Sequence, residues 1–179
     1  MSKQVTKKEV VKNYKFLALM IIAMIGGCIG TSNVLAGQMF DVPVKGTHAH
    51  SWIMSFPDEY TAFKTYADLY PNACILLVDT YDTLKSGVPN AIRVFTEMCE
   101  AGIKLTNYGI RLDSGDLAYL SKKARRMLDE AGFEDAIISA SNDLDEFLIH
   151  DLKNQGAKIT SWGVGTNLIT SKDCPSFGG

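Results

Sequence analysis

Residues 108–132, YGIRLDSGDLAYLSKKARRMLDEAG, decide the fold of this chain because one strand pattern in them is followed directly by one helix pattern. Tyr108–Leu112 is a short apolar run with β-type residues. From Asp116 to Ala131 the apolar residues recur every three or four positions, which places them on one face of a helix. Gly132 follows at the position where a left-handed helix cap favours glycine. The segment therefore predicts one βα unit.

The same alternation continues from about residue 40 to the end of the chain. Strands are expected at Val42–Val44, Cys74–Val78, Tyr108–Leu112, Ala136–Ser139 and Ile159–Val164, and helices at Asp58–Leu69, Val88–Ala101, Asp116–Ala131 and Asp143–Gln155. Strand–helix units that repeat about every thirty residues predict a parallel sheet. With 179 residues and no linker rich in Pro or Ser, the chain is expected to be one domain or part of one.

Two architectures fit this pattern, an open doubly wound sheet and a closed (β/α)₈ barrel. The open sheet usually begins with a Gly-x-Gly-x-x-Gly turn, which the sequence lacks. Polar residues follow every expected strand, and a barrel gathers the carboxyl ends of its strands around one mouth. We therefore favour the barrel. It would be incomplete, because about five strands are counted where eight are needed and about 250 residues are typical.

The strand exits carry residue types from which an active site can be built. They are Thr47 and His50, then Asp79 and Asp82, then Arg111 and Asp113, and finally Gly163, Gly165 and Thr166. A histidine at a strand exit suits nucleophilic or acid/base chemistry near neutral pH, and a structural role fits the same position equally well. The run of residues 79–83 also suits a helix cap, because Asp and Thr are common caps.

Arg111 and Asp113 alternate around Leu112, so both are expected on one face of the strand, toward the barrel centre. An inward guanidinium needs an anionic partner. Either Asp113 supplies it or a carboxylate or phosphate ligand does, and the sequence leaves both open. In residues 163–166 two glycines leave the backbone N–H groups accessible, and such groups can bind a phosphate. The exits together indicate chemistry on a phosphorylated substrate, with Mg²⁺ held by Asp residues and ligand phosphates.

The charge and the cysteines of the chain bear on its partners and on the compartment in which it works. The net charge is −2, without the basic excess that nucleic-acid binding requires. Four cysteines, Cys28, Cys74, Cys99 and Cys174, include no Cys-x-x-Cys pair, and Cys74 and Cys99 are expected to be buried free thiols. That pattern suits a reducing compartment.

The first thirty residues point in another direction. Five lysines precede an uncharged run from Phe16 to Gly30, which has the outline of a secretory signal. The run is short for a membrane span, which needs about 20 apolar residues. A buried helix from Val5 to Ile25 is the alternative.

Several motifs, in one order, resemble the nicotinate phosphoribosyltransferase family. They are IGG at 25–27, GTSNVLAG at 30–37, VKGTHAHSW at 44–52, LVDTYDT at 77–83, GIRLDSGDL at 109–117, ASNDLDE at 140–146 and WGVGT at 162–166. The resemblance implies an α/β fold, an incomplete TIM-like barrel of the type II phosphoribosyltransferases. It assigns residues 25–179 to this partial barrel and residues 1–24 to a divergent N-terminal helical segment.

The family forms nicotinate mononucleotide and pyrophosphate from nicotinate and 5-phosphoribosyl 1-pyrophosphate, coupled to ATP and Mg²⁺, in NAD salvage. By resemblance, His50 becomes the phosphohistidine and Asp113 is catalytic. Nicotinate is assigned to Thr47 and Arg111, the phosphoribosyl pyrophosphate to Thr166, Gly163 and Gly165, and supporting roles to Asp79 and Asp82. The resemblance also implies a cytoplasmic homodimer with no membrane or nucleic-acid partner. Two alternatives remain, a truncated non-catalytic remnant and an exported protein that reuses the barrel segment.

Overall fold

The computed structural model describes residues 23–169, and a parallel sheet of four strands lies at its centre. The strands are β1 (Cys74–Leu77), β2 (Tyr108–Leu112), β3 (Ile137–Ala140) and β4 (Ser161–Trp162). Their order in the sheet is their order in the chain, and each neighbouring pair is parallel. All four strands therefore direct their carboxyl ends to the same edge of the sheet.

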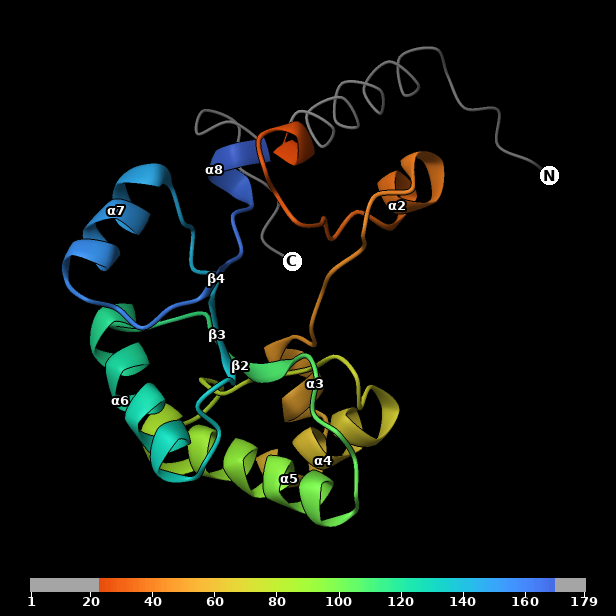
Figure 1. The fold of residues 1–179 in the computed structure, drawn as a ribbon, viewed down its shortest axis with the longest axis vertical. Helices are drawn as coiled ribbons and strands as arrows, with labels where there is room; N and C mark the ends of the chain where they lie inside the picture. Colours follow the sequence, from red (N-terminus) through yellow and green to blue (C-terminus); the bar gives the residue numbers. More distant parts are fainter. Residues whose placement is uncertain (1–22, 170–179) are drawn as a thin grey trace.

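Helices connect and cover these strands. They are α2 (Val34–Phe40), α3 (His50–Met54), α4 (Glu59–Leu69), the π-helical turn η1 (Thr83–Gly87), α5 (Val88–Glu100), α6 (Leu117–Glu130), α7 (Glu146–Asn154) and α8 (Thr166–Ile169). Figure 1 shows α5, α6 and α7 on one side of the sheet. Right-handed crossovers give this arrangement when the strand order never reverses, whereas a doubly wound sheet reverses its order. The sheet is an arc of a barrel, and the open-sheet alternative is wrong.

The predicted strand at Val42–Val44 is wrong. Residues near it form only one isolated parallel bridge, between Thr31 and Val44. Pro43 lies inside the expected strand and has no N–H to donate to a ladder. The described part of the chain therefore has four strands in its sheet, where about five were predicted. The other four strands are confirmed, although β4 is shorter than expected.

The predicted helices are confirmed to within three residues at each end, and side-chain caps explain where they begin. Asp58 accepts a hydrogen bond from the N–H of Thr61 at 2.8 Å, and Asp116 accepts one from the N–H of Tyr119 at 2.9 Å. Such caps satisfy N–H groups that have no partner inside the helix. The glycines after α5, α6 and α7 are Gly102, Gly132 and Gly156, with φ of 77°, 85° and 73°. These confirm the predicted left-handed caps.

The core lies between the sheet and its helices. Ile110 and Leu112 of β2 are fully buried, and each contributes about 1.5–3 kcal/mol when removed from water. Phe95 of α5 packs edge-on against Tyr108, with ring centroids 5.0 Å apart. Gly109 allows β2 to approach β3, because an added Cβ would lie 2.0 Å from the carbonyl oxygen of Ile137. Close backbone approach therefore requires glycine at this strand position.

Residues 23–45 lie apart from this core (Figure 1). Most of the predicted helical segment 1–24 lies outside the described residues, and so do residues 16–22 of the signal-like run and Cys174. Helix α2 begins at Val34, after the cap residue Asn33, whose side chain accepts from the N–H of Ala36. Within residues 23–169, no helix has the length and apolar character needed to cross a membrane. Cys74 is a buried free thiol as predicted, but Cys99 is exposed because it lies on the outer face of α5.

Candidate functional site

Polar side chains from four separate segments meet at the carboxyl edge of the sheet. They are Thr47 and His50 from the loop and helix before β1, Asp79 and Thr80 after β1, Arg111 and Asp113 around the end of β2, and Ser141 after β3. We call these seven residues the strand-end cluster. The sequence predicted that such residues would meet, and the structure brings five of the predicted site residues into one network.

Arg111 is the centre of that network. Its Nε donates to Ser141 Oγ at 2.7 Å and its Nη1 donates to Thr47 Oγ1 at 2.8 Å. Its Nη2 donates to Asp113 Oδ1 at 3.1 Å, which also forms an ion pair. Ser141 Oγ in turn donates to the same oxygen of Asp113. Asp113 is therefore the anionic partner of Arg111 in this structure, and the contact with a ligand stays a prediction.

Asp79 is the most deeply buried carboxylate of the cluster, with 2% of its side chain exposed. Its Oδ2 accepts from the backbone N–H of Asp113 at 2.8 Å and from Ser114 Oγ at 2.6 Å. Its Oδ1 has no hydrogen-bond partner within residues 23–169 and lies 3.9 Å from His50 Nε2. Asp79 thus has one oxygen fixed to β2 and one directed toward the imidazole.

His50 is the first residue of α3 and is the accessible imidazole of the cluster, with 37% of its side chain exposed. Its Nε2 lies 3.6 Å from Asp113 Oδ2, on the side where Asp79 also lies. Its Nδ1 lies 3.0 Å from Thr80 Oγ1. The two ring nitrogens therefore have chemically different neighbours, acidic at Nε2 and a hydroxyl at Nδ1.

His48 has a different environment, although only one residue separates it from His50. It is buried, its Nε2 accepts from the N–H of Leu77 at 3.2 Å, and its ring lies 4.4 Å from that of Tyr66. Burial first, and then the nearby charges of Arg111 and His50, lower the pKa of His48 to about 4. His48 is therefore a neutral structural imidazole that fixes the loop to β1, and His50 is the one available to a substrate.

Asp82 does not join the cluster. Its Oδ1 accepts from the N–H groups of Leu84 and Lys85, so it caps η1, and these backbone bonds, that of Lys85 first, lower its pKa. This is the capping alternative that the sequence left open. Its predicted role toward the substrate is not supported by any contact with the strand-end cluster in the described residues.

The predicted glycine turn follows β4 beside the cluster. The N–H of Gly163 donates to the carbonyl of Ala140 at 2.7 Å, and a Cβ added at Gly163 would lie 3.2 Å from the Cβ of Ser141. Gly165 is exposed, and nothing would lie within 4 Å of a Cβ there. The prediction for Thr166 concerns a side chain that the structure does not describe, so its phosphate contact stays a prediction.

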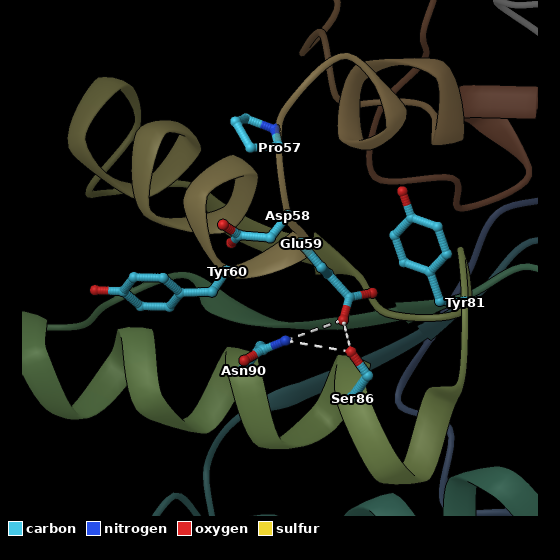
Figure 2. A pocket seen from close by; sticks show the side chains of 7 residues that line it. All are labelled: Pro57, Asp58, Glu59, Tyr60, Tyr81, Ser86 and Asn90. Atoms are coloured by element: carbon cyan, nitrogen blue, oxygen red, sulfur yellow. Dashed lines mark hydrogen bonds between the residues drawn. The ribbon is translucent and has the colours of Figure 1, made fainter.

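A shallow depression beside the cluster contains a second polar group. Figure 2 shows its lining, which is Pro57, Asp58, Glu59, Tyr60, Tyr81, Ser86 and Asn90. Glu59 is 4% exposed, and its Oε2 accepts from Ser86 Oγ at 2.5 Å and from Asn90 Nδ2 at 3.1 Å. These bonds join the start of α4 to η1 and α5. Glu59 thereby fixes the start of α4 to η1 and α5, a role the sequence did not reveal.

The structure shows which participants sequence reasoning missed. No role was predicted for Ser141 or Thr80, yet Ser141 bridges Arg111 to Asp113 and Thr80 contacts His50. Their only sequence signal was a hydroxyl directly after a strand. Within residues 23–169, no group of three or more His, Cys, Asp or Glu residues is arranged to hold a metal ion.

Comparisons with known proteins agree with this geometry. The sequence model of the nicotinate phosphoribosyltransferase (NAPRTase) family matches residues 1–174. Nicotinate phosphoribosyltransferase of Bacillus subtilis is 62% identical over 156 residues, covering 87% of this chain and 31% of that protein. The protein of that name from Dictyostelium discoideum is 41% identical over 199 residues, covering 86% and 33%. The crystal structure of human nicotinic acid phosphoribosyltransferase superposes with a TM-score of 0.74 at 28% identity, covering 84% of this chain and 40% of that one.

The fold and its neighbours define an α/β protein with an incomplete barrel of the type II phosphoribosyltransferase kind, as the sequence predicted. The chain belongs to the nicotinate phosphoribosyltransferase family. It spans about a third of the length of the curated relatives named above, 31% and 33%.

Proposed function

We propose that this chain carries the phosphoryl-accepting and nicotinate-binding part of a nicotinate phosphoribosyltransferase. The reaction joins nicotinate and 5-phosphoribosyl 1-pyrophosphate into nicotinate mononucleotide and pyrophosphate, coupled to ATP hydrolysis, in NAD salvage. The observation that carries the proposal is the accessible imidazole of His50, which lies beside the carboxylates of Asp79 and Asp113. Family resemblance extends the proposal to a cytoplasmic homodimer.

His50 is the proposed phosphoryl acceptor. One imidazole nitrogen attacks the γ-phosphorus of ATP, the N–P bond forms, the bond from γ-phosphorus to the bridging oxygen breaks, and ADP leaves with the electron pair. The ring becomes positively charged during this step. Asp79 and Asp113, which lie 3.9 and 3.6 Å from Nε2, stabilise that charge through their fixed carboxylates.

Arg111 and Thr47 are the proposed contacts of the nicotinate carboxylate. The guanidinium fork suits a carboxylate because it can donate two parallel hydrogen bonds. Thr47 Oγ1 already accepts from Arg111 Nη1, so the hydroxyl and this edge of the fork lie together. The turn after β4, which contains Gly163, Gly165 and Thr166, is the proposed site for a phosphate of the phosphoribosyl group, beside Ser141.

The side chains of the described residues fit Mg²⁺ less well than the sequence suggested. The described residues contain no group of three or more side chains of the metal-binding types placed to hold an ion. Mg²⁺ commonly uses one or two carboxylates together with substrate phosphates. Residues 23–169 therefore do not preform a magnesium site by themselves.

Phosphoryl labelling tests the proposal. The 179-residue chain is incubated with ATP labelled at the γ-phosphate, and we expect acid-labile label on His50 that disappears in His50→Ala and persists in His48→Gln. A chimaera in which residues 25–179 replace the matching segment of the Bacillus subtilis relative is assayed for nicotinate mononucleotide. An active chimaera that loses ATP coupling in His50→Ala supports the proposal. Label on His48 would overturn the assignment of His50, whereas a folded chimaera that is inactive and unlabelled would support the non-catalytic remnant.

A further inference from the structure

Thr80 lies directly after Asp79 at the exit of β1 and contacts the imidazole on the side opposite to the carboxylates. Its Oγ1 is 3.0 Å from His50 Nδ1. Nε2 of the same ring lies 3.6 Å from Asp113 Oδ2 and 3.9 Å from Asp79 Oδ1. Both ring nitrogens are thus approached by polar groups of residues that follow the ends of β1 and β2.

The carboxylates decide which nitrogen carries the proton. An ionised carboxylate only accepts hydrogen bonds, and a bare Nε2 lone pair directed at two of them would be repelled. Asp79 cannot turn away easily, because its Oδ2 is held by the N–H of Asp113 and by Ser114 Oγ. In the neutral ring Nε2 therefore carries the hydrogen and Nδ1 keeps a lone pair. The hydroxyl of Thr80 is then the donor and Nδ1 of His50 the acceptor.

We propose that Thr80 is a positioning residue for His50, and this proposal rests on the proposed function of His50 as phosphoryl acceptor. The hydroxyl holds the ring in the orientation in which Nδ1 is the only nitrogen that carries no hydrogen, and its hydrogen bond to Nδ1 gives way when the N–P bond forms. If the ring turned about its Cβ–Cγ bond, Nδ1 would leave the hydroxyl and Nε2 would leave the carboxylates. Thr80 thus selects Nδ1 as the atom that forms the N–P bond.

Two substitutions separate this role from a packing role. Thr80→Val keeps the shape of the side chain and removes the hydroxyl, whereas Thr80→Ser keeps the hydroxyl. Thr96→Val is the matched control, because Thr96 is exposed on α5 and its hydroxyl donates to the carbonyl of Ile92, away from the cluster. Far-ultraviolet circular dichroism shows whether each variant keeps its secondary structure.

The first measurement needs no nucleotide. Side-chain ¹⁵N spectra of the histidines, recorded on the 179-residue chain at mildly alkaline pH, distinguish a nitrogen that carries hydrogen from one that does not. We expect hydrogen on Nε2 of His50 and none on Nδ1. In Thr80→Val the Nδ1 resonance should move toward that of a nitrogen without a hydrogen-bond donor, and Thr80→Ser and Thr96→Val should leave it in place. Hydrogen on Nδ1 in the unmodified chain would overturn the proposal.

The second measurement uses phosphoramidate, which transfers its phosphoryl group to histidine and releases ammonia without an ATP site. Phosphorus NMR then identifies the modified nitrogen. We expect modification at Nδ1 of His50 in the unmodified chain and in Thr80→Ser. Thr80→Val should distribute the label over both nitrogens, because a ring without this hydrogen bond is free to turn about its Cβ–Cγ bond. Label confined to Nδ1 in Thr80→Val would refute the proposal, whereas absence of ATP labelling with these results intact would refute only the proposed function.

Discussion

Replacing His48 with glutamine tests whether this histidine is a buried, neutral support of the loop that carries His50. His48 has a pKa of about 4 in the folded chain against 6.5 when unfolded, chiefly because burial disfavours its charged form. Between those two values the unfolded chain binds more protons than the folded one. The contribution of His48 to stability is therefore complete above the unfolded pKa and is lost progressively as the pH falls from about 6.5 toward about 4.

The size of the effect follows from the same two values. Lowering the pH from about 7.5 to about 5 should reduce the free energy of unfolding by about 2 kcal/mol through His48 alone. Glutamine can accept the hydrogen bond from the N–H of Leu77 that His48 now accepts, but it does not titrate. His48→Gln should therefore lose about 2 kcal/mol less than the unmodified chain over this range, whatever its stability at neutral pH.

Urea unfolding followed by circular dichroism at several pH values measures this difference. The control is His150→Gln, because His150 is exposed on α7. A direct check is the titration of the His48 ring proton by NMR, which we expect well below the ordinary range. Identical pH dependence in His48→Gln and the unmodified chain, or titration of His48 near pH 6.5, would refute the assignment.

Three further outcomes are expected. In the chimaera, Arg111→Lys should raise the KM for nicotinate about tenfold while ATP hydrolysis changes little, because lysine keeps the charge and loses the fork; an unchanged KM in steady-state kinetics would leave Arg111 as a structural partner only. Gly109→Ala should lower the free energy of unfolding by about 2 kcal/mol or more in urea titrations, because the φ of Gly109 is 154° and the new Cβ would meet the carbonyl oxygen of Ile137. A variant as stable as the unmodified chain would contradict the close approach of β2 and β3. A thiol reagent should modify Cys99 in the folded chain and Cys74 only after unfolding, because Cys74 is buried and burial raises its pKa to about 12. Peptide mass spectrometry identifies the modified cysteine, and reaction of Cys74 in the folded chain would contradict its burial.

The fold was predictable from sequence where local signals agreed with one another. Tyr108–Leu112 was predicted to the residue, because the apolar run, the polar exit and the capping Asp116 all mark the same boundaries. The strand predicted at Val42–Val44 is absent because Pro43 removes one ladder donor between the two valines, and only Val44 of these three residues forms a bridge. Helix α3 was missed since it has no side-chain cap to mark its start.

The site was predictable as a meeting of strand ends but not in its division of roles. His48 and His50 have the same chemistry in the sequence, and they differ because residues 18 to 30 positions later contact them. Tyr66 and Leu77 bury one ring, whereas Thr80 and Asp79 contact the other. Burial and partner are tertiary properties, so composition and spacing could not separate the two.

The left-handed glycines after α5, α6 and α7 have a practical consequence for engineering. They lie at the turns that lead from helix back to strand, so they occupy the edge of the sheet opposite to the strand-end cluster. Nothing would lie within 4 Å of a Cβ at Gly102, Gly132 or Gly156. A short epitope or a fluorophore-labelled peptide inserted beside these turns would extend into open space. Such insertions can therefore report on the assembly of this chain while the chemistry at the other edge is left untouched.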